Sequence, residues 1–227
     1  SNMATVLGGH TRSPFRRLVA AVIVASVAAA CGGSGDGDAI DTTAAAAALD
    51  AQLARSAATG EAVVGVDCPF AGGRGLLRTL FAEIDDPEAA SALEGDFAAV
   101  YVDDPNGDYV ACDAFARDAD PAVGIAVLPA PDDVLAYIEA FYSEGAEVAV
   151  EGFVDEGDDF AGGAFSRSCA SASFVGGLPT CEVHWSNGEL FITTYVASSQ
   201  AMMLDLDPVE DRLRAQLPEL IDQLASI

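Results

Sequence analysis

Cys181-Glu-Val-His-Trp-Ser186, Asn187-Gly188 and Glu189-Leu-Phe-Ile-Thr-Thr-Tyr-Val196 form the stretch of sequence that decides the fold. Both flanking segments alternate apolar and polar residues and are rich in β-branched and aromatic side chains, which is typical of strands. Asn-Gly between two such segments is the strongest short hairpin signal. We therefore predict an antiparallel hairpin with a two-residue turn, in which Trp185 pairs with Leu190 and Val183 with Ile192.

The same alternation divides the side chains of this hairpin between two faces. Trp185 and Leu190 share one face with Val183 and Ile192, and we expect that face to line the core. The other face carries the candidate ligand-binding residues His184, Phe191, Thr193 and Tyr195. Two interpretations of the second face stay open: a helix or loop covers it, or it lines a ligand-binding concavity.

Further strands are predicted on both sides of this hairpin. Residues 97–103 and 109–115 alternate well and flank Asp104-Pro105-Asn106-Gly107, which is a strong turn sequence. Single strands are expected over 122–128 and 148–154, with a weaker one over 164–168.

Helical periodicity occupies most of the remaining chain. Helices are predicted over 44–58, 74–84 and 87–93, from Asp132 or Asp133 to Gly145, and from Asp207 to the end. Asp207-Pro208 reads as an N-cap followed by a proline at the first helical position, and Pro218 either kinks or restarts that last helix. Short strands joined by hairpins favour an α+β fold, with an antiparallel sheet and helices packed on one face. We assign one such domain to residues 44–227.

A different signal stands near the start of the chain. Arg16-Arg17 precedes the Ala- and Val-rich run 18–30, and Cys31-Gly-Gly-Ser-Gly35 follows it. A basic start, a short apolar run and small residues before a cleavage point make a secretory signal peptide. As a helix the run reaches only about 20 Å, short of the roughly 30 Å hydrocarbon core, so a membrane-spanning helix is the weaker interpretation. An ordinary cleaved signal is the other alternative.

Cys31, directly after the small residues, resembles the lipobox of bacterial lipoproteins. In that family the Cys thiol receives a diacylglycerol and the lipidated Cys becomes the mature N-terminus. The resemblance implies lipidation of Cys31 and a protein anchored on the extracytoplasmic face of the cell membrane. Ser1-Asn2 before Met3 is typical of a tag-cleavage scar. We therefore assign 1–30 to that scar and the signal peptide, and 31–43 to the lipidated Cys and a flexible tether.

The rest of the chain resembles, more loosely, small disulfide-containing envelope lipoproteins of actinobacteria whose function is unknown. Four cysteines follow Cys31, namely Cys68, Cys112, Cys169 and Cys181. An even number in an exported chain predicts two disulfides, and three pairings are formally open. We favour Cys169–Cys181 together with Cys68–Cys112. A thiol metal site would require reduced thiols outside the cell, and the chain has no CxxC spacing.

Charge excludes one class of function. The chain has 36 acidic against 10 basic residues and a net charge of −26, and every acidic residue follows residue 30. Nucleic-acid binding is excluded, because no basic stripe exists to neutralise phosphates.

Two acidic loops offer oxygen ligands for Ca²⁺ without the EF-hand spacing. Their candidate residues are Asp104, Asn106, Asp108, Asp155, Asp158 and Asp159. In a chain this acidic, such runs arise by chance, and solvated loops are the favoured explanation. We therefore predict no cofactor and keep Ca²⁺ as an open hypothesis.

The sequence predicts no catalytic residue. His184 is the one histidine after His10, no G-x-S-x-G elbow is present, and a zinc site would need more His or Cys ligands. The leading hypothesis is a non-catalytic, membrane-anchored module that binds a small molecule, an envelope polymer or a partner protein. Two alternatives remain: an envelope glycan or ester hydrolase that uses carboxylates or a Ser with His184, and a structural accessory subunit.

Overall fold

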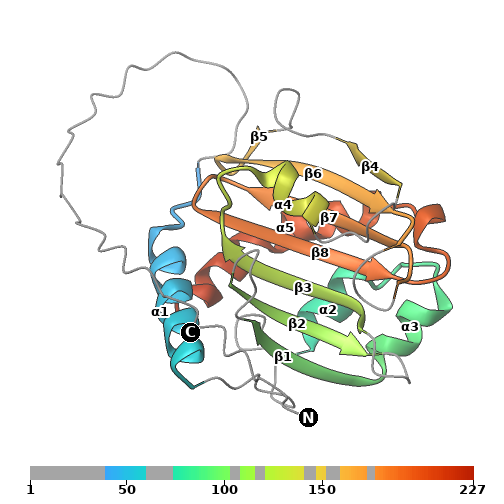
Figure 1. Cartoon of the computed structure of the whole chain (residues 1–227), viewed down its shortest axis with the longest axis horizontal. Coiled ribbons are helices and arrows are strands. Elements are labelled where there is room, and N and C mark those ends of the chain that lie inside the picture. Colours follow the sequence, from blue (N-terminus) through green and yellow to red (C-terminus); the bar gives the residue numbers. More distant parts are fainter. Residues whose placement is uncertain are drawn as a thin grey trace, which may run out of the picture. The chain divides into compact units, whose positions relative to one another are not determined.

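Antiparallel pairing organises the chain. The computed structural model describes residues 39–59, 74–102, 108–115, 121–140, 147–151, 159–172 and 177–227. Eight strands lie in these segments: β1 (Asp96–Val102), β2 (Tyr109–Phe115), β3 (Pro121–Pro129), β4 (Val148–Glu151), β5 (Asp159–Phe160), β6 (Gly163–Ala170), β7 (Thr180–Ser186) and β8 (Leu190–Ala197). They form one sheet in the order β1-β2-β3-β8-β7-β6-β4, with β5 paired to β6 (Figure 1). The predicted α+β class with a hairpin-built antiparallel sheet is confirmed.

The register of the β7–β8 hairpin differs from the prediction by two residues. Trp185 pairs with Ile192, and His184 pairs with Thr193. Asn187 is the cause, because its Oδ1 accepts hydrogen bonds from the backbone N–H groups of Glu189 at 3.0 Å and Leu190 at 2.9 Å. This side chain holds a loop wider than two residues. The shift is even, so each side chain keeps its predicted face.

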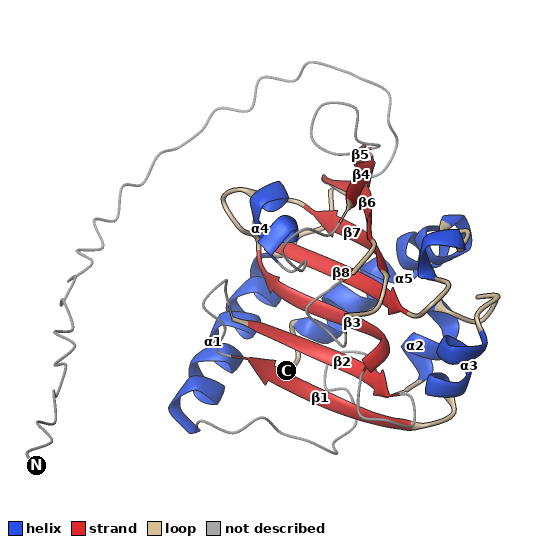
Figure 2. Cartoon of the chain, turned by 45° about the vertical axis from the view of Figure 1, so that its right-hand side comes forward, coloured by secondary structure: helices blue, strands red, loops and turns tan. Residues whose placement is uncertain are grey.

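Four helices pack with one face of this sheet. They are α1 (Thr43–Thr59), α2 (Gly75–Leu80), α3 (Pro87–Leu93) and α5 (Asp207–Leu224), whose buried residues belong to one apolar cluster with the strands. We call the strand side chains of this cluster the apolar face: Val110, Cys112, Val123, Ile125, Val127, Phe165, Val183, Trp185, Leu190, Ile192 and Val196. Figures 1 and 2 show α5 behind the sheet and α1 beside one end of β1, β2 and β3.

The short helix α4 (Val134–Ala140) packs on the opposite face. Its residues Tyr137 and Ile138 form a second, smaller cluster with Leu128, Ala170 and Phe191. Helices therefore lie on both sides of the sheet, although the larger core is on one side only.

The helix α5 begins differently from the prediction. Asp207 does not cap it, because Leu206 occupies the N-cap position and the Asp207 carboxylate pairs with Arg167 at 2.6 Å. Arg167 also pairs with Glu210 at 2.6 Å and so ties α5 to β6. Pro218 lies inside the helix, which continues without interruption to Leu224.

Contacts with the sheet begin before α1. Ile40 donates its backbone N–H to the Ala161 carbonyl at 3.0 Å, and the buried Thr42 hydroxyl donates to Glu189 at 2.6 Å. Residues 40–43 were predicted to belong to the tether, yet Ile40 and Thr42 have hydrogen-bond partners on the β5–β6 and β7–β8 loops. The part of the tether before residue 39 lies outside the described residues.

The late cysteines form the predicted disulfide. Cys169 and Cys181 are directly opposed on β6 and β7 and are bonded to each other. Cys112 is also disulfide-bonded. Cys68, which we predicted as its partner, and Cys31 lie outside the described residues. None of the helices that the structure describes is long and apolar enough to cross a membrane.

Candidate functional site

Polar and titratable side chains gather on the face of the sheet opposite the apolar face. They come from β2, β6, β7 and β8, and we call them the polar face: Asp113, Ser166, Ser168, Glu182, His184, Thr193 and Tyr195. Five of the seven are less than 10 % exposed. Buried polar atoms need partners, so their contacts decide what this face can do.

His184 is the most deeply buried titratable group of the polar face. Its Nε2 lies 2.9 Å from the Ser168 hydroxyl and 3.4 Å from Glu182 Oε2, and its ring stacks on Phe191 with centroids 5.2 Å apart. Within the described residues, its Nδ1 has no hydrogen-bond partner. Burial lowers the pKa of His184 to about 3, so the imidazole is neutral in ordinary buffers.

These three side chains do not have the geometry of a catalytic relay. In such a relay the His lies between the acid and the Ser, with the carboxylate on one ring nitrogen and the hydroxyl on the other. Here Glu182 and Ser168 approach the same nitrogen, and they also contact each other at 3.2 Å. Ser168 and His184 are each only 1 % exposed, and an imidazole with so low a pKa is a weak base.

Asp113 and Tyr195 form the second polar contact of this face. The Tyr195 hydroxyl donates to Asp113 Oδ1 at 2.8 Å. Burial raises the pKa of Asp113 to about 7, although the hydrogen bond from Tyr195 opposes that rise. Burial and the neighbouring Asp113 together raise the pKa of Tyr195 well above its usual value.

Gly124 makes this contact possible. It lies on β3 between the two side chains, and a Cβ there would stand 2.4 Å from Tyr195 Cε1 and 2.5 Å from Asp113 Oδ1. A glycine inside a strand often marks such a close approach. The two polar groups meet across β3 because Gly124 has no side chain.

The four predicted ligand-face residues do share one face, but none lines a described cavity. Phe191 is covered by α4, where the Tyr137 ring packs edge-on at 5.7 Å. His184 and Phe191 are each 1 % exposed, and Thr193 is 9 % exposed. Tyr195 is half-buried.

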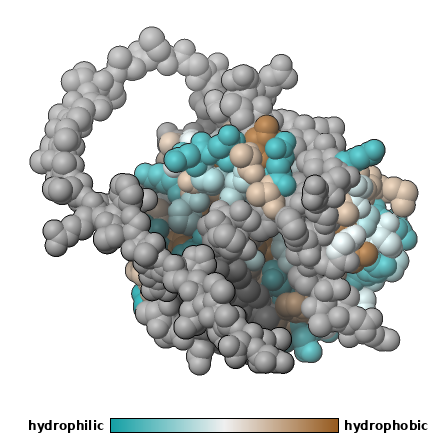
Figure 3. Space-filling view, in the orientation of Figure 1, coloured by the Kyte–Doolittle hydropathy of each residue, from teal (hydrophilic) through white to brown (hydrophobic). Residues whose placement is uncertain are grey.

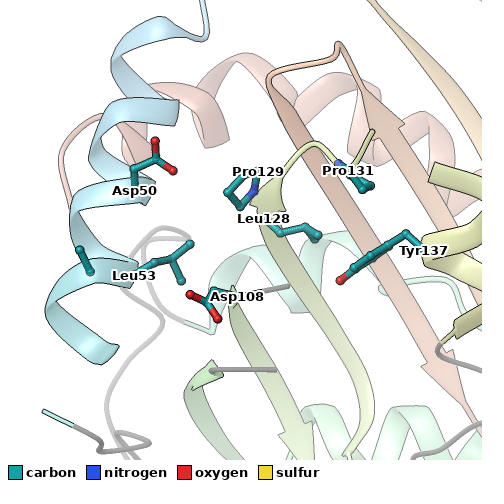
Figure 4. Close-up of a pocket in the computed structure, with 8 residues that line it drawn as sticks. Asp50, Leu53, Asp108, Leu128, Pro129, Pro131 and Tyr137 are labelled. Atoms are coloured by element: carbon teal, nitrogen blue, oxygen red, sulfur yellow. The ribbon is translucent and has the colours of Figure 1, made fainter. Parts of the chain in front are cut away.

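A cavity of about 450 Å³ lies beside this covered region, between α1, α4 and the end of β3 (Figure 4). Its volume falls within the roughly 300–1,000 Å³ of small-molecule sites. We call it the α1–α4 cavity; it is lined by Asp50, Leu53, Ala54, Asp108, Leu128, Pro129, Pro131 and Tyr137. Leu53, Leu128 and the prolines supply apolar walls. Tyr137 and Leu128 also contact Phe191, which links the cavity to the polar face.

Asp108 is the one cavity residue that the sequence also singled out, as a Ca²⁺ candidate. Asp104 and Asn106 of the same predicted loop lie outside the described residues, as do Asp155 and Asp158 of the second acidic loop, whose Asp159 belongs to β5. Among the residues that the structure describes, no three His, Cys, Asp or Glu side chains are arranged to hold a metal ion.

Sequence reasoning missed the cavity because its walls come from distant parts of the chain.

No protein-family model, curated protein or solved structure matches this chain. On the face shown in Figure 3, hydrophilic and hydrophobic residues are interspersed among the coloured part of the surface. Function is therefore inferred from the cavity and the polar face.

Proposed function

We propose that this chain is a non-catalytic lipoprotein, held on the extracytoplasmic face of the membrane by a lipid on Cys31, whose domain binds a small organic molecule. The α1–α4 cavity is the observation that carries the binding part of the proposal. Its volume of about 450 Å³, its apolar walls and its few polar groups have the character of a small-molecule site.

The hydrolase alternative receives less support. The Ser168, Glu182 and His184 arrangement puts both oxygens on one imidazole nitrogen and buries the hydroxyl that would attack a substrate. The cavity itself holds Asp50 and Asp108, and its described lining residues include no serine or histidine. Binding without turnover needs only shape and contacts, which the cavity has.

Blocking the cavity tests the binding proposal. We expect ligand-observed NMR to detect small organic fragments that bind the full chain at the cavity. Ala54→Phe would place a ring in the cavity from α1 and should weaken these fragments at least tenfold. Ala51→Phe is the matched control, since Ala51 is exposed on the same helix and does not line the cavity. Fragments that bind all three proteins equally, or no binding fragment at all, would contradict the proposal.

The anchor has its own test. Expressed in a bacterium with its export machinery, the full chain should label with radioactive palmitate and partition into the detergent phase. Cys31→Ala should abolish the label and move the protein to the aqueous phase without changing its melting temperature. Continued membrane association of Cys31→Ala would refute lipid anchoring through this residue, whatever the result for the cavity.

A further inference from the structure

Two carboxylates line the α1–α4 cavity. Asp50 comes from α1 and Asp108 from the residue before β2, and both line the same space (Figure 4). Among the residues that the structure describes, neither makes an ion pair and no basic residue lines the cavity. Both side chains therefore contribute negative charge to this site.

A few acidic residues elsewhere in the fold have arginine partners. Arg167 and Arg214 both pair with Glu210 at 2.6 Å, and Arg212 pairs with Glu83 at 2.7 Å. The chain has only ten basic residues, and three of its arginines form these ion pairs. Other exposed acids, Asp211 among them, also make no ion pair within the described residues, so the cavity acids are distinguished by their position on a concave, partly apolar surface.

This combination suits one class of ligand. A concave site of one charge sign with low-dielectric walls concentrates ions of the opposite sign. Leu53, Leu128 and the two prolines offer contacts to an apolar body, and the Tyr137 ring adds attraction for a cation near its face. A bare Ca²⁺ ion fits less well, because it takes 6–8 oxygen ligands. Two carboxylates and a tyrosine hydroxyl provide too few.

We infer that the α1–α4 cavity selects a small organic cation, an ammonium group joined to an apolar body. The inference rests on the proposed function and adds the chemical class of its ligand. The ammonium group lies between the Asp50 and Asp108 carboxylates, and the apolar body lies against Leu128 and the prolines.

An isosteric pair of probes separates charge from shape. Choline and 3,3-dimethylbutan-1-ol have the same outline, but a neutral carbon replaces the quaternary nitrogen in the second. We expect calorimetric or NMR titration of the full chain to show choline binding at least tenfold more tightly. The preference should shrink at high salt, because the attraction is screened.

Variants locate the preference. Asp50→Asn with Asp108→Asn should bring the two probes to equal affinity, and Ala54→Phe should weaken both. Asp211→Asn is the control, because Asp211 is an exposed acid on α5 outside the cavity, and it should leave the preference unchanged.

The outcomes distinguish this inference from the proposed function. The cation inference fails, and the binding function stands, if both probes bind equally well in an Ala54-dependent manner. The same holds if only neutral fragments bind in that manner. If nothing binds in an Ala54-dependent manner, both fail. If CaCl₂ alone raises the melting temperature and the double Asn variant abolishes the rise, the carboxylates form a metal site and the inference is overturned.

Discussion

Trp185 and His184 are neighbours on one strand, and both are buried, yet they belong to faces of the sheet with opposite physical character. Trp185 is 0 % exposed on the apolar face and His184 is 1 % exposed on the polar face. Burial stabilises the first through removal of apolar surface from water. On the second face it penalises the charged forms of His184 and Asp113. Burial of equal extent therefore makes stability depend on pH on the polar face but not on the apolar face.

Trp185→Ala should have the largest effect and define the apolar face. The change removes the largest fully buried side chain and leaves a cavity, so we expect it to lower the free energy of unfolding by about 3–5 kcal/mol. Trp185→Phe keeps a ring but loses the Nε1–H hydrogen bond to the Phe160 carbonyl at 3.1 Å, which should cost about 1–2 kcal/mol. Urea denaturation measures both. A loss below about 1 kcal/mol for Trp185→Ala would contradict a tightly packed apolar face.

Asp113→Asn should have the next largest effect, and with the opposite sign. Folding raises the pKa of Asp113 from its usual 3.8 to about 7, so the native state takes up a proton between these values. The stability that Asp113 contributes is therefore lost as pH rises from about 4 to 7 and is constant above. Asn cannot ionise, and at pH 8 the variant should be about 2–4 kcal/mol more stable than the wild type.

Asp211→Asn controls for the change in net charge, because this acid is exposed on α5. Equal gains from both substitutions would show that general charge repulsion, rather than burial on the polar face, is responsible. The measurement is the free energy of unfolding in urea at pH 8 and pH 5.

His184 should titrate in the other direction. Its pKa is lowered from 6.5 to about 3 on folding, so the stability it contributes is present above pH 6.5 and is lost as pH falls toward 3. Between about pH 4 and 6.5 the slopes of His184 and Asp113 are opposed. Asp113→Asn should expose a loss of stability on acidification, and His184→Gln should expose a gain.

The double variant supplies the reference for that test, since it retains only the slope of the remaining groups. Denaturation curves from pH 4 to 7.5 compare all four proteins. Single variants whose slopes both match the double variant would mean that neither residue titrates differently in the two states.

Local pattern predicted the elements on both faces but not the contacts on the polar face. Strands β2 and β8 alternate clearly in sequence. The predicted face of each side chain in the β7–β8 hairpin is correct despite the register error, because the shift was even. Strand β6 was predicted weakly, because Ser166 and Ser168 occupy its inner positions on the polar face and erase the usual hydropathy signal. Cys169 of β6, by contrast, was predicted to bond to Cys181 of β7, because an even number of cysteines follows Cys31 and these two are close in sequence.

The contacts of the polar face and the cavity are non-local. Asp113 meets Tyr195 only because Gly124 stands between them, which requires the β2-β3-β8 order and register. Asp50 and Asp108 line one cavity only because α1 packs beside β3. The sequence contained each residue, but the pairings depend on a topology that no local pattern specifies.

The smallest predicted effect compares two adjacent threonines. Thr193 Oγ1 is buried on the polar face and has no hydrogen-bond partner in the described part of the chain, whereas Thr194 Oγ1 donates to the Val183 carbonyl at 3.4 Å on the apolar face. Replacing a hydroxyl by a methyl group leaves the shape nearly unchanged. Removing an unsatisfied buried hydroxyl should be neutral or stabilising by up to about 1 kcal/mol, and removing a bonded one should cost about 0.5–1 kcal/mol.

Thr193→Val and Thr194→Val are therefore expected to shift the urea midpoint in opposite directions, or Thr193→Val not at all. Both substitutions replace a buried threonine by valine on the same strand. Effects of the strand, the residue type and burial are therefore common to both variants and cancel when the two are compared. Only the face differs. Equal losses in both variants would mean that the Thr193 hydroxyl has a partner, and that the polar face is satisfied in the same way as the apolar one.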